Sequence, residues 1–396
     1  MRTRTFVATV FAAACCLALI VPLAGQQTPA RPFRPAVRAG NFLYLSGALP
    51  AGPDGRIVAG DIKAQTTRAL DNLRSVLAAN GAQMDRVAAV SVYLKRAGDF
   101  AAMNEVYRTY WPSDPPVRTT VIAPLVVPEA LVEISMIAIA GGAERTVIRP
   151  ADWLTSPNPY SYAIRSGDTL FMSGLVSRHG KDNTPIQGDV TVQTHAVMRN
   201  AGAILKAAGM DYRDVVSARV FLTDTALFEA MNAAYRAYFP SDPPARATVR
   251  AGLTSADYRV EIALTAVAAK DRRVVGTPNA DGSTAPPNPN LSSAIRAGDR
   301  LFLSGMLGNT DGNAGDLGSQ TREALARVGR TLQAAGFDWS HVVDSTVYLT
   351  DATRTPEMND AYQQMLLKGF PARATIEAGL MSPTALVEIM MTAVKN

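Results

Sequence analysis

The sequence has few of the residues that most often carry covalent or metal chemistry. Its 396 residues include only two cysteines and three histidines. Both cysteines, Cys15 and Cys16, lie within the first 25 residues, so the rest of the chain can form neither a disulfide nor a thiolate metal site. The three histidines show no ligand spacing, which argues against zinc. GxSxG, P-loop and dinucleotide-binding motifs are also missing. We therefore expect no metal and no cofactor.

An excess of charge of one sign is missing as well. The formal net charge is +5, and removal of Arg2 and Arg4 with a leader would lower it to +3. This balance is too weak to predict nucleic-acid binding, and there is no stripe of alternating basic and aromatic residues, which weakens a ribonuclease hypothesis. A hydrophobic content of 47% is typical of a soluble globular protein.

The first 25 residues have the order of a secretory signal peptide. Two arginines precede a long apolar run, and small residues precede Gln26. An uncleaved membrane anchor is the alternative, and lipidation at Cys15 is disfavoured because the apolar run continues beyond it. We expect an exported protein, periplasmic in a bacterial cell, with no stable membrane association after cleavage.

The remainder of the chain contains nearly the same sequence three times. PPVRTTV, PPARATV and FPARATI place arginines at intervals of 128 and 127 residues (118 to 246, 246 to 373), and three VEI strings place glutamates at the same intervals. A period this long is a domain and not a solenoid unit. Ser-Gly pairs and Met-Asn pairs recur in step with them. The repeated residues are Arg118, Arg246, Arg373, Glu133, Glu261, Glu388, Gly47, Gly174, Gly305, Asn104, Asn232 and Asn359.

These landmarks define three domains, predicted at residues 31–140, 159–269 and 288–396 after a signal peptide at 1–25. The connections at 141–158 and 270–287 differ in character. The second is rich in Pro, Gly and Asn and is predicted to be a flexible linker, whereas the first contains Trp153 and could pack along a domain surface.

Each copy has the pattern of an α+β domain of order ββαβαββ. An alternating segment is interrupted at Gly40, Gly167 and Gly298, where a tight hairpin needs a positive φ. An amphipathic helix follows, ending near a glycine, then a strand, a second helix with the Met-Asn pair, and two strands around the arginine and the glutamate. We expect both helices on one face of a mixed sheet, with the bare face against the other copies.

Taken together, these motifs resemble the RidA family, also called YjgF/YER057c/UK114. The resemblance covers nearly all of the chain after the leader, in three passes. It implies a chorismate-mutase-like fold, ligand sites between neighbouring subunits of a trimer, and hydrolysis of reactive 2-imino or 2-enamino acids to 2-oxo acids and ammonia. One chain would then form the trimer-like unit by itself.

The resemblance also implies roles for individual residues. The carboxylate-binding arginine falls on Arg118, Arg246 and Arg373, and the water-handling glutamate on Glu133, Glu261 and Glu388. The family tyrosine is present once, as Tyr160, with Phe33 and Leu291 at the other two places. Backbone groups near Gly47, Gly174 and Gly305 would position the nitrogen of the imine, and Asn104, Asn232 and Asn359 are candidate substrate contacts. The middle copy supplies the most complete set, Tyr160, Arg246 and Glu261, although a cleft between domains would combine residues of different copies.

The chemistry suits these residue types. A guanidinium holds a carboxylate through two parallel hydrogen bonds, and a glutamate can deprotonate a water for attack on the adjacent C=N carbon.

Several alternatives stay open. Each arginine and glutamate could form an ion pair that locks two domains together, the asparagines could bond locally within their helices, and the Ser-Gly pairs could only mark strand ends. The replacements at Phe33 and Leu291 also allow a module that binds small carboxylates without turnover.

Overall fold

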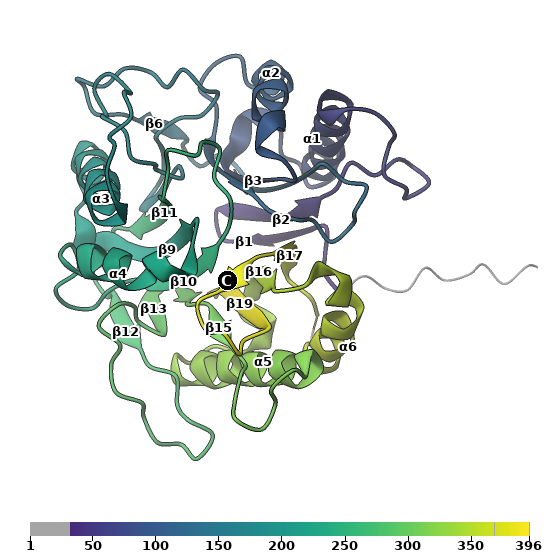
Figure 1. The fold of residues 1–396 in the computed structure, drawn as a ribbon, viewed down its shortest axis with the longest axis vertical. Coiled ribbons are helices and arrows are strands. Elements are labelled where there is room, and N and C mark those ends of the chain that lie inside the picture. Colours follow the sequence, from purple (N-terminus) through teal and green to yellow (C-terminus); the bar gives the residue numbers. More distant parts are fainter. Residues whose placement is uncertain (1–31, 368, 396) are drawn as a thin grey trace, which may run out of the picture. The chain divides into compact units, whose positions relative to one another are not determined.

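A computed structural model describes residues 32–367 and 369–395 (Figure 1). The predicted leader, including Cys15 and Cys16, lies outside these residues. Within them, three modules of one architecture follow one another. In the described part of the chain, no helix is long and apolar enough to cross a membrane.

The predicted order of helices and main strands recurs in every module, and the second and third modules contain additional short strands. The first module contains β1 (Ala36–Ala39), β2 (Phe42–Ala48), α1 (Ile62–Ala79), β3 (Val87–Leu94), α2 (Phe100–Tyr110), β4 (Val117–Ile122) and β5 (Val132–Ile139). The second contains β6 (Thr146–Ile148), β7 (Ala163–Ser166), β8 (Thr169–Met172), α3 (Val190–Ala207), β9 (Val215–Leu222), α4 (Phe228–Arg236), β10 (Ala245–Arg250) and β11 (Val260–Val267). The third contains β12 (Arg273–Val275), β13 (Ala294–Ala297), β14 (Arg300–Leu303), β15 (Met306–Leu307), α5 (Leu317–Ala334), β16 (Val342–Leu349), α6 (Thr355–Met365), β17 (Ala372–Glu377), β18 (Gly379–Leu380) and β19 (Val387–Val394). Short 3-10 turns precede β3, α2 and their counterparts, at Met84–Arg86, Ala97–Asp99, Tyr212–Asp214, Thr225–Leu227, Trp339–His341 and Ala352–Arg354.

Local sequence sets both ends of the long helices. The side chain of an aspartate caps each N-terminus, as Asp61 does by accepting a hydrogen bond from the Ala64 N–H at 3.0 Å. Just beyond each C-terminus, Gly81, Gly209 and Gly336 take positive φ values, which cost glycine little. The same residue types recur at these ends, so each module forms an equivalent helix of the same length.

Each sheet has two faces with different partners. Within each module the hairpin lies beside the last strand, which is followed by a parallel pair, as in β1-β2-β5-β3-β4. In the second sheet, β18 of the third module adds to the outer side of β10. Leucines of α1, including Leu70 and Leu73, pack with Leu43 and Ile134 in the module's own core. Figure 1 shows the pairs α1–α2, α3–α4 and α5–α6 outside their sheets. The predicted α+β fold with two helices on one sheet face is confirmed.

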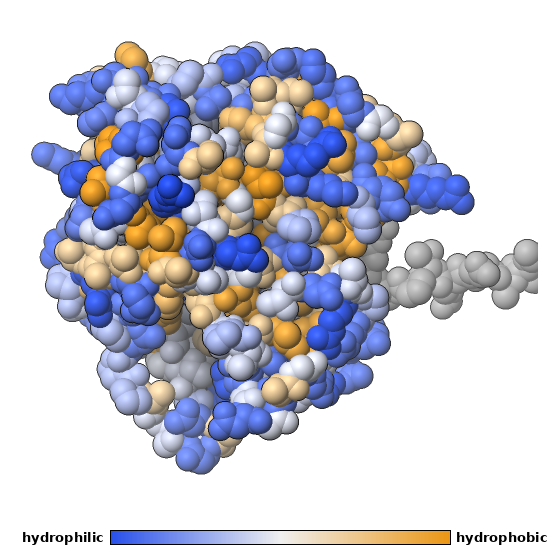
Figure 2. Space-filling view, in the orientation of Figure 1, coloured by the Kyte–Doolittle hydropathy of each residue, from blue (hydrophilic) through white to orange (hydrophobic). Residues whose placement is uncertain are grey.

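The other sheet faces meet in an apolar cluster shared by all three modules. Tyr93, Phe221 and Tyr348, at equivalent places on β3, β9 and β16, are fully buried there. Backbone pairing also joins the modules, since β10 pairs with β18 and isolated bridges link Ile122 to Gly252 and Leu125 to Ile376. On the face in Figure 2, apolar residues gather toward the middle and hydrophilic residues surround them. Burial of the bare faces therefore holds the modules together.

Both connecting segments add a strand to the sheet that follows them. β6 pairs with β7 and β12 pairs with β13. Trp153, in the first connection, is buried and packs edge-on against Tyr162 with ring centroids 5.0 Å apart. The prediction of a flexible linker is wrong for residues 273–275, because these residues form β12 and extend the edge of the third module's sheet. The sequence pattern did not indicate a strand there.

Candidate functional site

Each repeated arginine lies on the outermost strand of its own module's sheet, and its side chain is buried. Arg118, Arg246 and Arg373 expose 3%, 1% and 5% of their surface. The tyrosine four residues after the methionine of each Met-Asn pair lies under the guanidinium, with Cζ to ring-centroid distances of 4.7, 4.9 and 4.9 Å for Tyr107, Tyr235 and Tyr362. The negative face of the ring partly compensates the buried charge. Burial lowers the pKa of all three arginines.

The Ser-Gly pairs join each arginine strand to the next module. Ser173 Oγ accepts a hydrogen bond from the Arg118 N–H at 2.9 Å and donates to the Ser161 carbonyl at 2.7 Å. Ser304 does the same between Arg246 and Ser292, and Ser46 between Arg373 and Arg34. The Gly174 and Gly305 N–H groups donate to the Arg118 and Arg246 carbonyls at 3.1 and 3.2 Å. These two N–H groups are therefore engaged, and the predicted contact to an imine nitrogen would fall to a carbonyl.

Each glutamate lies beside the glycine of a Ser-Gly pair. In the first module the pairing of β2 with β5 is irregular between Leu45 and Ala48, so the chain bulges at this point. A side chain at Gly47, Gly174 or Gly305 would overlap the carboxyl group of Glu133, Glu261 or Glu388. Glycine is required here because it leaves the space that the carboxyl group occupies.

Burial raises the pKa of every one of these glutamates into the neutral range. The pKa of Glu261 rises to about 7, and those of Glu133 and Glu388 rise to about 8. Desolvation of the carboxylate is the main cause. A hydrogen bond from a backbone N–H of the neighbouring module opposes it, and for Glu261 this donor is Thr120 at 3.2 Å. Carboxyl groups with such values can exchange protons near pH 7.

The arginine of one module shares its surroundings with the glutamate of the next. Arg118 and Glu261 line one cavity of about 150 Å³ together with Tyr160, Gly174 and other residues, and we call this cavity the first cleft. Its remaining lining residues are Phe100, Thr120, Asn158, Val176, Arg178, Thr254, Ser255 and Tyr258. Residues from the first and second modules thus meet around one space.

The other two sets follow the same rule. Arg246 acts on the pKa of Glu388, and Arg373 acts on that of Glu133. The three residues of the middle copy, Tyr160, Arg246 and Glu261, are therefore divided between two sets, because Arg246 lies with Glu388 of the third module. The strand that carries each arginine packs against the following module, and the glutamate strand of its own module lies elsewhere in the sheet. Phe33 lies 5.3 Å from Arg373, and Tyr160 lies 6.0 Å from Arg118, measured from ring centroid to Cζ.

The asparagines of the Met-Asn pairs contact arginines in two modules. Asn232 Oδ1 accepts from Arg246 Nη2 at 2.7 Å, and Asn359 Oδ1 accepts from Arg373 Nη2 at 2.8 Å. Asn104 instead donates to Asn158 Oδ1 at 3.4 Å. Asn232 and Asn359 thereby orient a guanidinium, while direct contact with a substrate stays a prediction for all three.

Each of the three arginines keeps an N–H donor group that no protein atom among the described residues accepts. Nη1 of Arg118, Arg246 and Arg373 is buried and has no hydrogen-bond partner within residues 32–367 and 369–395. None of the ion pairs in the same residues joins these arginines to the three glutamates. The alternative of an interdomain ion pair is therefore wrong. A buried guanidinium with a free N–H group favours an anionic ligand, because a carboxylate supplies both charge and acceptors.

Sequence reasoning missed two recurring residues that position the site. A buried glutamine in the first turn of each long helix, such as Gln193, accepts from the Arg259 N–H at 2.8 Å and donates to the Asp257 carbonyl at 2.8 Å. It fixes the start of the strand that carries Glu261. The second recurring residue that was missed is the tyrosine whose ring lies under each arginine. Both recur at the period of the repeat, so that period was the signal that could have identified them.

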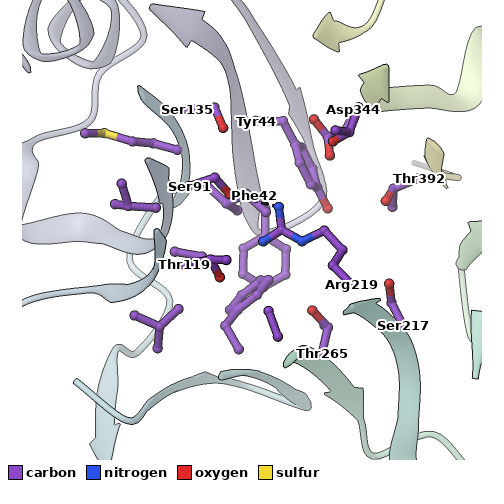
Figure 3. Close-up of a pocket in the computed structure, with 18 of the residues that line it drawn as sticks. Phe42, Tyr44, Ser91, Thr119, Ser135, Ser217, Arg219, Thr265, Asp344 and Thr392 are labelled. Atoms are coloured by element: carbon purple, nitrogen blue, oxygen red, sulfur yellow. Dashed lines mark hydrogen bonds between the residues drawn. The ribbon is translucent and has the colours of Figure 1, made fainter. Parts of the chain in front are cut away.

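A second cavity, of about 110 Å³, is lined by all three modules (Figure 3). Arg219 extends into it, and Nη1 donates to Ser91 Oγ at 2.9 Å. Asp344 lies across the cavity, and burial raises its pKa to about 6. The equivalents of Arg219 are Ser91 and Thr346, and those of Asp344 are Ala89 and Ser217, so this cavity lacks the threefold repetition of the clefts. In the described part of the chain, no group of three or more His, Cys, Asp or Glu side chains could hold a metal ion.

The fold and the repeated site define a class of protein: tandem α+β modules in which an arginine of one module meets a glutamate of the next. The family model described as Endoribonuclease L-PSP matches residues 25–140, 152–268 and 282–395. The chain belongs to this family and is a tandem three-domain protein of the RidA type.

Several known relatives each match about the length of one module. A RutC family protein of Pyrococcus horikoshii is 43% identical over 111 residues, 28% of this chain and 88% of that protein. One from Sulfurisphaera tokodaii is 42% identical over 106 residues, 27% of this chain and 85% of that protein. The crystal structure of RidA from an Antarctic Psychrobacter is 29% identical, with a TM-score of 0.29, and spans 31% of this chain and 98% of its own.

Proposed function

We propose that this protein hydrolyses 2-imino acids, and the 2-enamino acids in equilibrium with them, to 2-oxo acids and ammonia in the first cleft. One observation supports this most directly. A buried guanidinium with a free N–H group and a carboxyl group with a pKa of about 7 line the same small cavity. The export predicted from the first 25 residues stays a prediction beside this proposal.

Arg118 binds the carboxylate of the substrate. Its ring contacts with Tyr107 and Phe100, at 4.7 and 5.5 Å, hold the guanidinium in place before the substrate arrives. Because the guanidinium is planar and already oriented, two parallel hydrogen bonds fix the position of the adjacent C=N carbon. Little further ordering is then needed for reaction.

Glu261 moves the proton. Its ionised form takes a proton from a water molecule while the water oxygen attacks C2 of the iminium form of the substrate, and the electron pair of the C=N π bond moves to the nitrogen to give a neutral amine. The same carboxyl group then returns a proton to the nitrogen, the C–N bond breaks as ammonia leaves with the bonding electron pair, and the carboxylate removes the hydroxyl proton as the C=O bond forms. This last proton passes to ammonia or solvent, which restores the carboxylate. One water is consumed and no electrons are exchanged with another reactant. A pKa of about 7 suits both directions of transfer.

A second function, binding of small carboxylates without turnover, fits the other two clefts better. Burial raises the pKa of Glu133 and Glu388 to about 8, close to that of Glu261, so the contrast between the clefts lies in the residue beside each arginine. Phe33 and Leu291 stand in place of Tyr160 and supply no hydroxyl group. Arg246 and Arg373 nevertheless keep a free donor for a carboxylate.

The test measures turnover in each cleft separately. An amino acid oxidase generates 2-iminobutanoate from 2-aminobutanoate, and formation of 2-oxobutanoate is followed with and without the protein. We expect acceleration by the wild type and a loss of at least a hundredfold in Arg118→Ala and Glu261→Gln, because binding and proton transfer both fail. Arg246→Ala and Arg373→Ala are the matched controls and should retain most of the activity.

Two results would overturn the proposal. If the wild type does not accelerate imine hydrolysis, the protein is not an imine hydrolase. If Arg118→Ala keeps full activity while Arg246→Ala or Arg373→Ala loses it, the reaction takes place in another cleft.

A further inference from the structure

The first cleft contains a second arginine, at a position where the other two modules have other residues. Arg178 lines the same cavity as Arg118 and Glu261 and is the fourth residue after Gly174. The fourth residue after Gly47 is Ala51, and the fourth after Gly305 is Asn309. Because it occurs only once, the triplicated pattern of the sequence gave no sign of it.

Neighbouring residues hold Arg178 in place. Its Nε donates to the Tyr258 hydroxyl, its Nη1 donates to the Asn183 carbonyl, and its guanidinium lies 5.7 Å from the Tyr258 ring centroid. Asn200 fixes the backbone by donating to the Arg178 carbonyl at 2.6 Å. These contacts use two of its three nitrogens and leave Nη2 for a ligand.

The charge of Arg178 is not neutralised by the protein. No ion pair in the described residues includes it. Among the residues that line the first cleft, Arg118 and Arg178 are positive and Glu261 is the one acid. A monocarboxylate supplies acceptors to one guanidinium, whereas a ligand with two carboxylates supplies acceptors to each.

We infer that the first cleft selects substrates with a second carboxylate, namely 2-imino dicarboxylates. Arg118 binds the carboxylate next to the imine carbon, and Arg178 binds the distal one. The inference rests on the proposed function of the same cleft and names its substrate class. The reaction that supplies such a substrate is the oxidation of an acidic amino acid at its α-carbon.

The first experiment measures binding of stable product analogues by calorimetry. Wild-type protein is titrated with 2-oxoglutarate, oxaloacetate and 2-oxobutanoate. We expect at least one dicarboxylate to bind tenfold or more tightly than 2-oxobutanoate. Arg178→Ala should lose at least tenfold in affinity for that dicarboxylate and change less than twofold for 2-oxobutanoate.

The variants are chosen so that the protein itself supplies controls. Arg178→Ala and Arg178→Asn introduce the residues that the first and third modules have at this position, Ala51 and Asn309. Both modules adopt the same fold with these residues. Arg199→Ala removes one exposed arginine on α3 and controls for the loss of net charge. Arg178→Lys keeps the charge and should keep part of the preference. An equal loss for both ligand classes in Arg178→Ala, or the same loss in Arg199→Ala, would refute the inference.

The second experiment separates this inference from the proposed function. Imines are generated from D-aspartate or L-glutamate by the matching oxidase and compared with 2-iminobutanoate. Arg178-dependent binding of dicarboxylates without hydrolysis of any imine would sustain the inference and refute the proposed enzyme. Hydrolysis of 2-iminobutanoate with no preference for dicarboxylates would sustain the enzyme and refute the inference.

Discussion

Replacement of Glu261 by glutamine should remove activity and raise stability above neutral pH. Glutamine keeps an oxygen that can accept the Thr120 N–H, and it has the shape of glutamate, so packing beside Gly174 is conserved. What it removes is the ionisable group. The variant therefore isolates the cost of burying a carboxylate at this position.

The size of the effect follows from the pKa. Folding raises the pKa of Glu261 from 4.5 to about 7, which corresponds to about 3 kcal/mol at 1.36 kcal/mol per unit. Because the pKa is raised in the folded state, the cost is absent below pH 4.5, grows between pH 4.5 and 7, and is complete above pH 7. With an unfolding entropy of about 2.1 cal/mol/K per residue over about 365 residues, it equals about 4 °C in Tm.

The assay is thermal unfolding of the wild type and Glu261→Gln at pH 4.5, 6 and 8. We expect equal Tm values at pH 4.5 and a higher Tm for the variant at pH 8. Glu129→Gln, which changes an exposed carboxyl group, should show no such trend. A Tm difference that is the same at all three pH values would refute the reasoning. It would mean that the substitution acts through packing and not through ionisation of the Glu261 carboxyl group.

Two further predictions concern the glycine step and the assembly. Gly174→Ala places a methyl group where the Glu261 carboxyl lies, so we expect at least a tenfold loss of activity and a destabilisation of about 1–3 kcal/mol; urea unfolding and turnover measure both, and Gly142→Ala, which meets open space, should change neither. Since successive modules of one chain supply all three arginine–glutamate sets, light scattering should give the mass of a single chain, and a mass of three chains would contradict this arrangement.

Much of the module was predictable from local sequence. Asp61 and Gly81 stand at the two ends of a helix because capping and positive φ depend on near neighbours in the chain. The same holds for the hairpin at Gly40. Repetition added the remaining certainty, since three copies of one pattern must satisfy one fold.

The partners of the site residues could not be predicted in this way. The sequence placed Arg246 and Glu261 in one copy, yet the modules meet so that Arg246 lies with Glu388. An edge strand has free backbone groups and packs against whichever neighbour covers it. That choice depends on contacts between residues more than a hundred positions apart, on which no local pattern reports.

The sequence by itself determined that three similar α+β modules exist and which residues recur in them. Only the tertiary structure decided that the recurring residues are shared between modules, that burial brings the pKa of Glu261 close to 7, and that Arg178 joins the first cleft alone. The physical reason is that helix ends and turns are set by adjacent residues, whereas burial and charge in a cleft are set by surfaces that meet after folding.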